Sequence, residues 1–132
     1  MTAPDYSHRP LLVFVDQVND WAAIARSADY WHVMAEHCRS AENLRDEGKR
    51  IILWLELKGH DDAAAQLDEA MAALRRALWN LQEACEGVYP PDESRCVDAL
   101  EVVVDKASKL AGAAEDLDDE VPEEAWEGFF DE

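Results

Sequence analysis

Hydrophobic residues recur at intervals of three and four through the second half of the chain. The first such stripe consists of Ala64, Leu67, Met71, Leu74, Leu78, Leu81, Cys85 and Val88. This alternation keeps apolar side chains on one narrow face of an α-helix for more than three heptads. Asp61 and Asp62 precede the stripe, where carboxylates suit a helix N-terminus, and Gly87, Pro90 and Pro91 follow it. The pattern predicts a long helix over residues 61–88.

A second stripe with the same spacing begins after Asp92. It consists of Val97, Leu100, Val103 or Val104, Ala107, Leu110, Ala114 and Leu117. Two helices of similar length joined by a short turn form an antiparallel hairpin, here predicted over residues 61–88 and 92–117. Because Cys85 and Cys96 are symmetric about the turn, we expect them to be neighbours with free thiols.

The first half of the chain has a weaker helical pattern. Apolar residues from Leu11 to Ala25 fit a helix that begins after Pro10, although the β-branched residues in this stretch leave a strand as the alternative. A further stripe runs from Tyr30 to Leu44, and Gly48 marks a break or kink. Residues 50–58 fit either a helix or a short buried strand, which Gly59 ends.

The predicted fold is an all-α, four-helix-bundle-like domain that contains the long antiparallel hairpin and carries an acidic C-terminal tail. At 132 residues, the chain allows one compact domain. We place the bundle at residues 1–117 and the tail at 118–132. Four tryptophans are expected to be core or groove anchors: Trp21, Trp31, Trp54 and Trp79.

Composition restricts the compartment and the kind of partner. The formal net charge is −18, so nucleic acid and anionic membranes would repel the protein, and its partners should present basic surfaces. The three cysteines form no CxxC pair, which predicts neither a zinc site nor a disulfide framework. With no predicted signal peptide or membrane span, we expect a cytoplasmic protein. The helical seam could also pair with a second chain, so a homodimer stays open.

The C-terminal segment concentrates this charge. Residues Gly112 to Glu132 contain ten carboxylates and no Lys or Arg. Trp126, Phe129 and Phe130 interrupt the acids at a spacing that puts all three rings on one helical face. Such a block is expected to stay extended or weakly helical until a partner neutralises it. The predicted partner-binding residues are Glu115, Asp116, Asp118, Asp119, Glu120, Glu123, Glu124, Trp126, Glu127, Phe129 and Phe130.

Candidate catalytic patterns are weak. The pairs Glu83-x-x-Glu86 and Glu115-x-x-Asp118 resemble the carboxylate motifs with which all-α NTP pyrophosphatases hold Mg²⁺. In the predicted hairpin, however, residue 83 lies opposite residue 98, and Glu115 lies roughly 25 Å further along the axis. The two pairs therefore cannot share one ion. Near the turn, four acids lie at similar heights along the predicted hairpin: Glu83, Glu86, Asp98 and Glu101. A divalent-cation site at this cluster stays open as a minor alternative.

Other chemistry has less support. His32, Glu36 and His37 lack the spacing of a zinc motif, and no phosphate loop or nucleophile elbow is present in the sequence. We predict no enzyme activity, no cofactor and no resident metal.

Two function classes compete. The first is an inhibitor that mimics nucleic acid and blocks the basic groove of a nucleic-acid-processing enzyme, of the anti-CRISPR, anti-restriction or nuclease-immunity type. The second is a helical adaptor or chaperone that docks its acidic aromatic tail into a groove on a partner. In both cases the partner is a basic protein surface. Neutralising acids should weaken the first kind of binding, whereas removing the aromatic rings should weaken the second.

Overall fold

The computed structural model describes residues 9–28, 31–87 and 92–129. Over these ranges the chain forms helices and no strand; the elements are α1 (Pro10–Arg26), α2 (Trp31–Ser40), α3 (Glu42–Leu57), α4 (Asp61–Glu86), α5 (Glu93–Glu120) and the short 3-10 helix η1 (Glu123–Trp126). The prediction of an all-α protein is confirmed. Residues 50–57 belong to α3, so the strand alternative for this segment is wrong.

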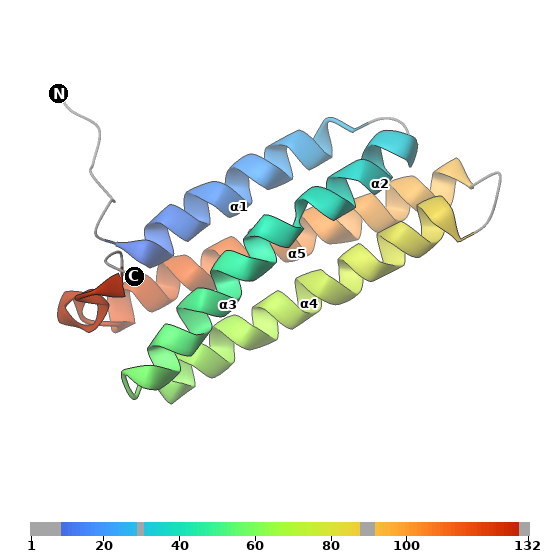
Figure 1. The fold of residues 1–132 in the computed structure, drawn as a ribbon. Helices are drawn as coiled ribbons and strands as arrows, with labels where there is room; N and C mark the ends of the chain where they lie inside the picture. The colour runs from blue at the N-terminus through green and yellow to red at the C-terminus, as the bar shows by residue number, and fades with distance from the viewer. Residues whose placement is uncertain (1–8, 29–30, 88–91, 130–132) are drawn as a thin grey trace, which may run out of the picture.

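The helices make four rods of a bundle (Figure 1). α2 and α3 follow one another on either side of Ala41 and together form one interrupted rod. α5 packs against α1 and α4, and α3 packs against α4 and α1. Each rod therefore has two main neighbours, and α5 lies diagonally across the bundle from α3. This arrangement confirms the predicted four-helix bundle.

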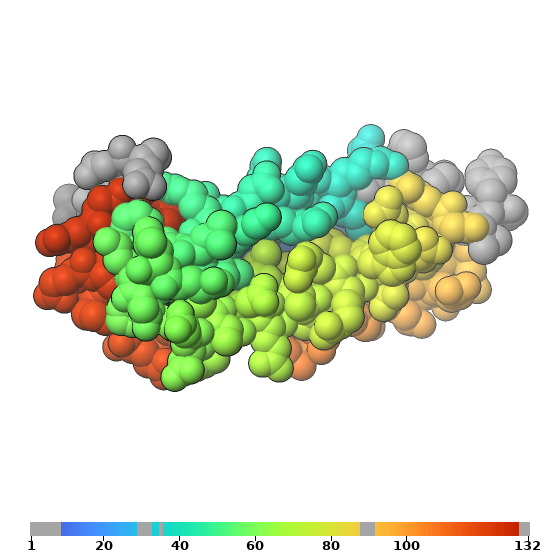
Figure 2. Space-filling view, turned by 60° about the horizontal axis from the view of Figure 1, so that its bottom comes forward, coloured from blue at the N-terminus to red at the C-terminus, as the bar shows by residue number. Residues whose placement is uncertain are grey.

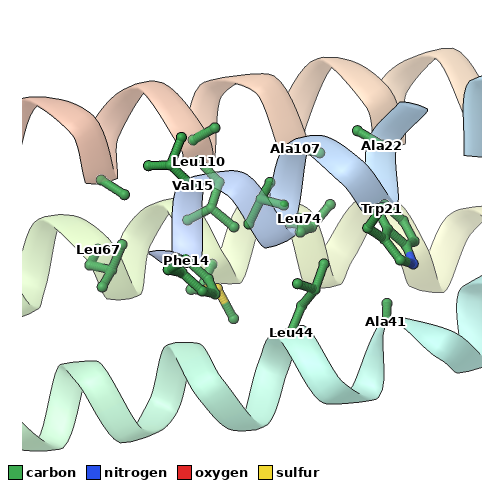
Figure 3. Packing of buried hydrophobic residues seen from close by; sticks show 14 of the residues in the cluster. Phe14, Val15, Trp21, Ala22, Ala41, Leu44, Leu67, Leu74, Ala107 and Leu110 are labelled. Atoms are coloured by element: carbon green, nitrogen blue, oxygen red, sulfur yellow. The ribbon is translucent and has the colours of Figure 1, made fainter. Parts of the chain in front are cut away.

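Apolar residues from all four rods meet along the bundle axis. Figure 3 shows Phe14 and Val15 of α1 pointing into the space bounded by the other helices, where Leu44, Leu67 and Leu74 also lie. Each of these side chains is buried. Burying a side chain of this size stabilises the fold by about 1.5–3 kcal/mol, so the interior stripe of each helix provides most of the force that holds the rods together.

Gly48 permits close packing, and the predicted break at this residue is wrong. α3 continues through it, and the helical rod is interrupted at Ala41 instead. A Cβ atom on residue 48 would lie 2.8 Å from Sδ and Cε of Met71 and 3.3 Å from Cζ of Phe14. Glycine therefore lets α3 approach α4 and α1 more closely than any larger residue would allow.

We expect Gly48→Leu to lower the free energy of unfolding by about 1–3 kcal/mol, because the added atoms must displace Met71 and Phe14 in a packed interior. The matched control is Gly112→Leu, at an exposed position in α5 where nothing lies within 4 Å of an added Cβ. The control should be neutral or stabilising, because leucine favours a helix more than glycine does. Urea denaturation of both variants measures the difference, and equal stability of the two would contradict the close approach.

The predicted hairpin is present as α4 and α5. The Asp92 carboxylate accepts hydrogen bonds from the backbone N–H groups of Ser94 and Arg95, at 2.9 and 3.4 Å, and so caps the start of α5. Cys85 and Cys96 lie side by side as free, buried thiols, which confirms the expected register. Burial, followed by the contact with Cys96, raises the pKa of Cys85 to about 12.

Two details of the predicted core differ. Val97 is 45% exposed, and Cys96 takes the buried position at the start of the α5 stripe. Trp21 and Trp54 are buried as predicted, but Trp79 is 63% exposed and so is no core anchor. The side chain of Trp31 lies outside the described residues. The difference at Trp79 follows from its place one residue after Leu78 and two before Leu81, which turns its side chain away from the buried stripe of α4.

Candidate functional site

The acidic C-terminal segment begins as part of the bundle. α5 extends to Glu120, three residues past the predicted end of the domain at 117. Leu117 is 1% exposed and belongs to the core, whereas Glu115 and Asp116 beside it are exposed. The acids of this stretch are therefore held on a helix whose opposite face is already packed.

The chain then folds back onto the bundle. Val121 ends α5 with an extended backbone, Pro122 precedes η1, and Gly128 adopts a left-handed conformation with φ +87°. Trp126 is 5% exposed and Phe129 is 1% exposed. The expectation of a separate tail beginning at residue 118 is thus wrong for its described part, because α5 continues to Glu120 and because Val121, Trp126 and Phe129 belong to the core. Phe130 lies outside the described residues.

Specific contacts fasten this segment to α3, and we call residues 121–129 the C-terminal clasp. The indole Nε1–H of Trp54 donates a hydrogen bond of 2.8 Å to the carbonyl oxygen of Ala125. Arg50 donates to the carbonyl oxygen of Phe129 and places its guanidinium 3.9 Å from the centre of the Phe129 ring. The Phe129 ring also meets Trp54 and Trp126 edge to face, with centroids 5.5 and 5.6 Å apart.

The rings and the acids consequently face in opposite directions. The rings of Trp126 and Phe129 point inward, so these two predicted docking residues present no exposed aromatic face. The exposed acids of this end of the bundle, which we call the acidic end, are Glu115, Asp116, Asp119, Glu120, Glu123, Glu124 and Glu127. A hollow beside Glu120 is lined by Asp61 and Asp62 at the start of α4, so negative charge continues onto the neighbouring rod.

Asp118 differs from the other predicted acids. It is 9% exposed and forms an ion pair with Arg9, just before α1. Burial raises the pKa of Asp118 above its ordinary value of 3.8, whereas the charge and hydrogen bond of Arg9 act in the opposite direction. Asp118 therefore ties the start of the described chain to α5 and is not available at the surface as predicted.

The weaker candidate sites do not come together. Among the described residues, no group of three or more His, Cys, Asp or Glu side chains is arranged to hold a metal ion. Glu86, one of the acids near the hairpin turn, instead forms an ion pair with Arg39 of α2. His37 stacks on Trp21 with ring centroids 4.7 Å apart, and its Nε2 lies 3.0 Å from the Trp21 carbonyl oxygen. The side chain of His32 lies outside the described residues.

Sequence reasoning did not identify the basic residues that organise this region. Arg9 and Arg50 are separated from their partners by 109 and 79 positions. Periodicity places side chains on one face of one helix, and it carries no information about which distant segment that face meets. The available signal was the pairing of Arg50 with Trp54 at i, i+4, which puts a cation and a large ring on the same surface of α3.

No described helix combines the length and the apolar composition that crossing a membrane requires. Comparison of the chain with protein-family models, with curated proteins and with solved structures finds no match.

Proposed function

We propose that the protein binds a basic surface through its acidic end and thereby competes with nucleic acid for a nucleic-acid-processing enzyme. The observation that supports this proposal is that the aromatic rings of the clasp are buried in the core, whereas the carboxylates at this end are exposed on a packed helix. Preorganised charges lose little conformational entropy when they bind, so a fixed acidic surface is a better ligand for a basic groove than a flexible acidic tail.

The charge density of this surface supports mimicry. Four exposed carboxylates lie within one short stretch of α5: Glu115, Asp116, Asp119 and Glu120. At a rise of 1.5 Å per residue, this stretch covers about 7.5 Å of helix axis. Duplex DNA presents about four phosphate charges over the same length. A basic groove built for DNA would therefore meet a similar local charge at this end of the bundle.

The inhibitor would then belong to the anti-CRISPR, anti-restriction or nuclease-immunity type in its mode of action, and it would act where such enzymes act, in the cytoplasm. The alternative of a helical adaptor that docks through Trp126 and Phe129 is disfavoured. Both rings are in the core, so the clasp would have to open before either ring could reach a partner, and the cost of exposing them would be subtracted from the binding energy.

Two charge-matched variants test the proposal. The first converts the four α5 acids to amides: Glu115→Gln, Asp116→Asn, Asp119→Asn and Glu120→Gln. The control converts two Asp and two Glu at exposed positions on α1 and α3: Asp16→Asn, Asp20→Asn, Glu42→Gln and Glu56→Gln. Each variant loses four negative charges, so the net charge stays equal while its position changes.

The measurement is displacement of labelled duplex DNA from purified restriction endonucleases, CRISPR effector nucleases and toxin nucleases at about 150 mM NaCl, an ionic strength at which the Debye length is about 8 Å. We expect wild type and the α1/α3 control to displace DNA from at least one enzyme, and the α5 amide variant to need at least tenfold more protein. Equal loss in both variants would show that net charge alone acts, and absence of displacement from every enzyme would refute the proposal for these classes.

A further inference from the structure

A second surface of the bundle, formed by α3 and α4, combines exposed apolar side chains with arginines. Figure 2 shows the face formed by α3 and α4, where a hollow runs between the two helices. We call this hollow the α3–α4 groove. Ile52, Leu53 and Met71 supply its apolar lining. Leu53 is 55% exposed, and Trp79, beside the groove on α4, is 63% exposed. Large apolar side chains left open to water on adjacent helices are typical of an interaction surface.

Four basic residues lie along this face: Arg45, Lys49 and Arg75 line the groove, and Arg75 and Arg76 line the hollow around Trp79. In the described part of the chain, none of these four forms an ion pair with another side chain. In the groove lining, Asp46, Glu56 and Asp68 balance the three bases. The hollow around Trp79 contains Arg75 and Arg76 and has no acid in its lining, so the excess of positive charge is found there. In a protein of net charge −18, this is a local reversal of sign around an exposed tryptophan.

The same chain also carries the complementary surface. On the outer side of α5, near the hairpin turn, Val97 and Val102 are 45% and 46% exposed. Asp98 and Glu101 lie between them, are exposed, and form no ion pair with any described residue. We call residues 97–102 the α5 ridge. It presents apolar and acidic side chains on one helical surface, which is what an exposed tryptophan flanked by two arginines recognises.

One molecule cannot bring its own ridge to its own groove. α5 packs against α1 and α4 on the far side of the bundle from α3, so the ridge points away from the α3–α4 face. The hydrophobic seam of the hairpin is likewise occupied, because Leu67, Leu74 and Leu81 are at most 1% exposed inside the bundle. The seam that the sequence offered to a second chain is therefore filled by the chain's own helices.

We propose that copies of this chain associate head to tail, with the α5 ridge of one copy against the Trp79 hollow of the next, at the edge of its α3–α4 groove. Asp98 and Glu101 then face Arg75 and Arg76, and the valines cover Trp79. Because the two surfaces differ, the contact is heterologous and leaves a free ridge and a free groove at the ends of each assembly. Association should therefore continue beyond a dimer as the protein concentration rises.

Ionic strength gives this contact a recognisable signature. At about 10 mM salt the Debye length is about 30 Å, and two bodies of charge −18 repel each other over their whole length. At 0.15 M it falls to about 8 Å, which suppresses the long-range repulsion while charges in direct contact still attract. Self-association should thus be weaker at 10 mM than at 150 mM NaCl, the opposite of a simple association between oppositely charged proteins.

Complementary variants test the proposal by sedimentation velocity at 150 mM NaCl. A groove variant carries Arg75→Glu and Arg76→Glu, and a ridge variant carries Asp98→Lys and Glu101→Lys. Each should weaken self-association at least tenfold, equivalent to about 1.4 kcal/mol. Because each retains one intact surface, and the two altered surfaces carry opposite charges, a mixture of the two should associate although neither variant does so alone. The fourfold variant, whose net charge equals that of wild type, should regain association through reversed charges.

Trp79→Gln supplies a variant without a change of charge, and it should also weaken association. A wild-type protein that stays monomeric at 150 mM NaCl up to millimolar concentration would overturn the proposal. So would self-association that both the groove and ridge variants retain, or a mixture of the two that shows no complex. These outcomes do not depend on DNA displacement, so failure here leaves the proposed function intact, and the reverse also holds.

Discussion

Replacing Phe129 with alanine is expected to lower the free energy of unfolding by about 3–5 kcal/mol, the cost typical of truncating a buried phenylalanine. The side chain is 1% exposed and meets Trp54, Trp126 and the guanidinium of Arg50. Its removal would leave a cavity at the point where the clasp joins α3. A domain of this size is stable by roughly 5–15 kcal/mol, so one residue near the C-terminus would account for a large share of the total.

The measurement is urea denaturation followed by circular dichroism, with Trp79→Ala as the control. Trp79 is also a large aromatic residue but is 63% exposed, so its truncation should change stability by no more than about 0.5 kcal/mol. Trp54→Phe tests the hydrogen bond of the clasp separately, because it keeps an aromatic ring and removes the N–H that donates to the carbonyl oxygen of Ala125. We expect it to cost about 1 kcal/mol. If Phe129→Ala were no more harmful than Trp79→Ala, the segment would be a free tail after all.

Deletion of the chain from residue 115 onward is expected to destabilise the bundle as well as to remove acids. A flexible tail could be removed from residue 115 onward without harm to the bundle. In the structure that deletion would take away Leu117, Trp126 and Phe129, each of which is at most 5% exposed. Loss of binding by such a truncated protein would therefore reflect unfolding as well as loss of acids. Substitutions of exposed acids test function better, because they leave the core intact.

Arg9→Met is expected to destabilise the protein at pH 7 by about 1–3 kcal/mol, because it leaves the Asp118 carboxylate buried without its partner. The estimate is below the full cost of breaking a buried pair, since the Arg9 side chain is 40% exposed and solvent screens part of the interaction. Methionine retains much of the length of the arginine stem, so the change chiefly removes the charge and the hydrogen bond.

The pH dependence of this deficit has a definite sign. Burial raises the pKa of Asp118 in the folded protein above its ordinary value of 3.8. The neutral carboxyl is therefore favoured in the folded state, and its contribution to stability is complete below 3.8 and lost as the pH rises through the folded pKa. Without Arg9 this folded pKa rises further. The difference in stability between Arg9→Met and wild type should thus be largest at pH 7 and shrink as the pH falls toward the folded pKa of Asp118.

Thermal denaturation of both proteins between pH 7 and pH 5 measures this convergence. Asp118→Asn in the Arg9→Met background is the control, since it removes the carboxylate and should abolish most of the pH-dependent part of the deficit. A difference between Arg9→Met and wild type that does not vary with pH would mean that Asp118 remains hydrated in the folded protein. General stabilisation by relief of self-repulsion at lower pH is shared by both proteins and cancels in the comparison.

The amino-acid sequence by itself determined the two helices of the hairpin and their register. The α4 and α5 stripes repeat with the period of a helix, and Asp92 and Gly59 act locally, as a cap and as a left-handed stop. Such signals depend on neighbours within a few residues, so they can be read without the fold. The meeting of Cys85 and Cys96 follows for the same reason, since a short turn leaves little freedom in how two helices pair.

Only the tertiary structure decided what the C-terminal aromatic residues do. The spacing of Trp126 and Phe129 showed that they could share a face, and it could not show whether that face met a partner or the protein's own α3. The deciding groups, Arg50 and Trp54, lie more than seventy positions away in the sequence. Whether a hydrophobic side chain packs in the protein's own core or on a partner depends on which apolar surface lies within reach. The positions of those surfaces are set only when the four rods have packed. The other acids remained exposed in either case, because burying an unpaired carboxylate costs several kcal/mol. Asp118 is buried, and it forms an ion pair with the half-exposed Arg9.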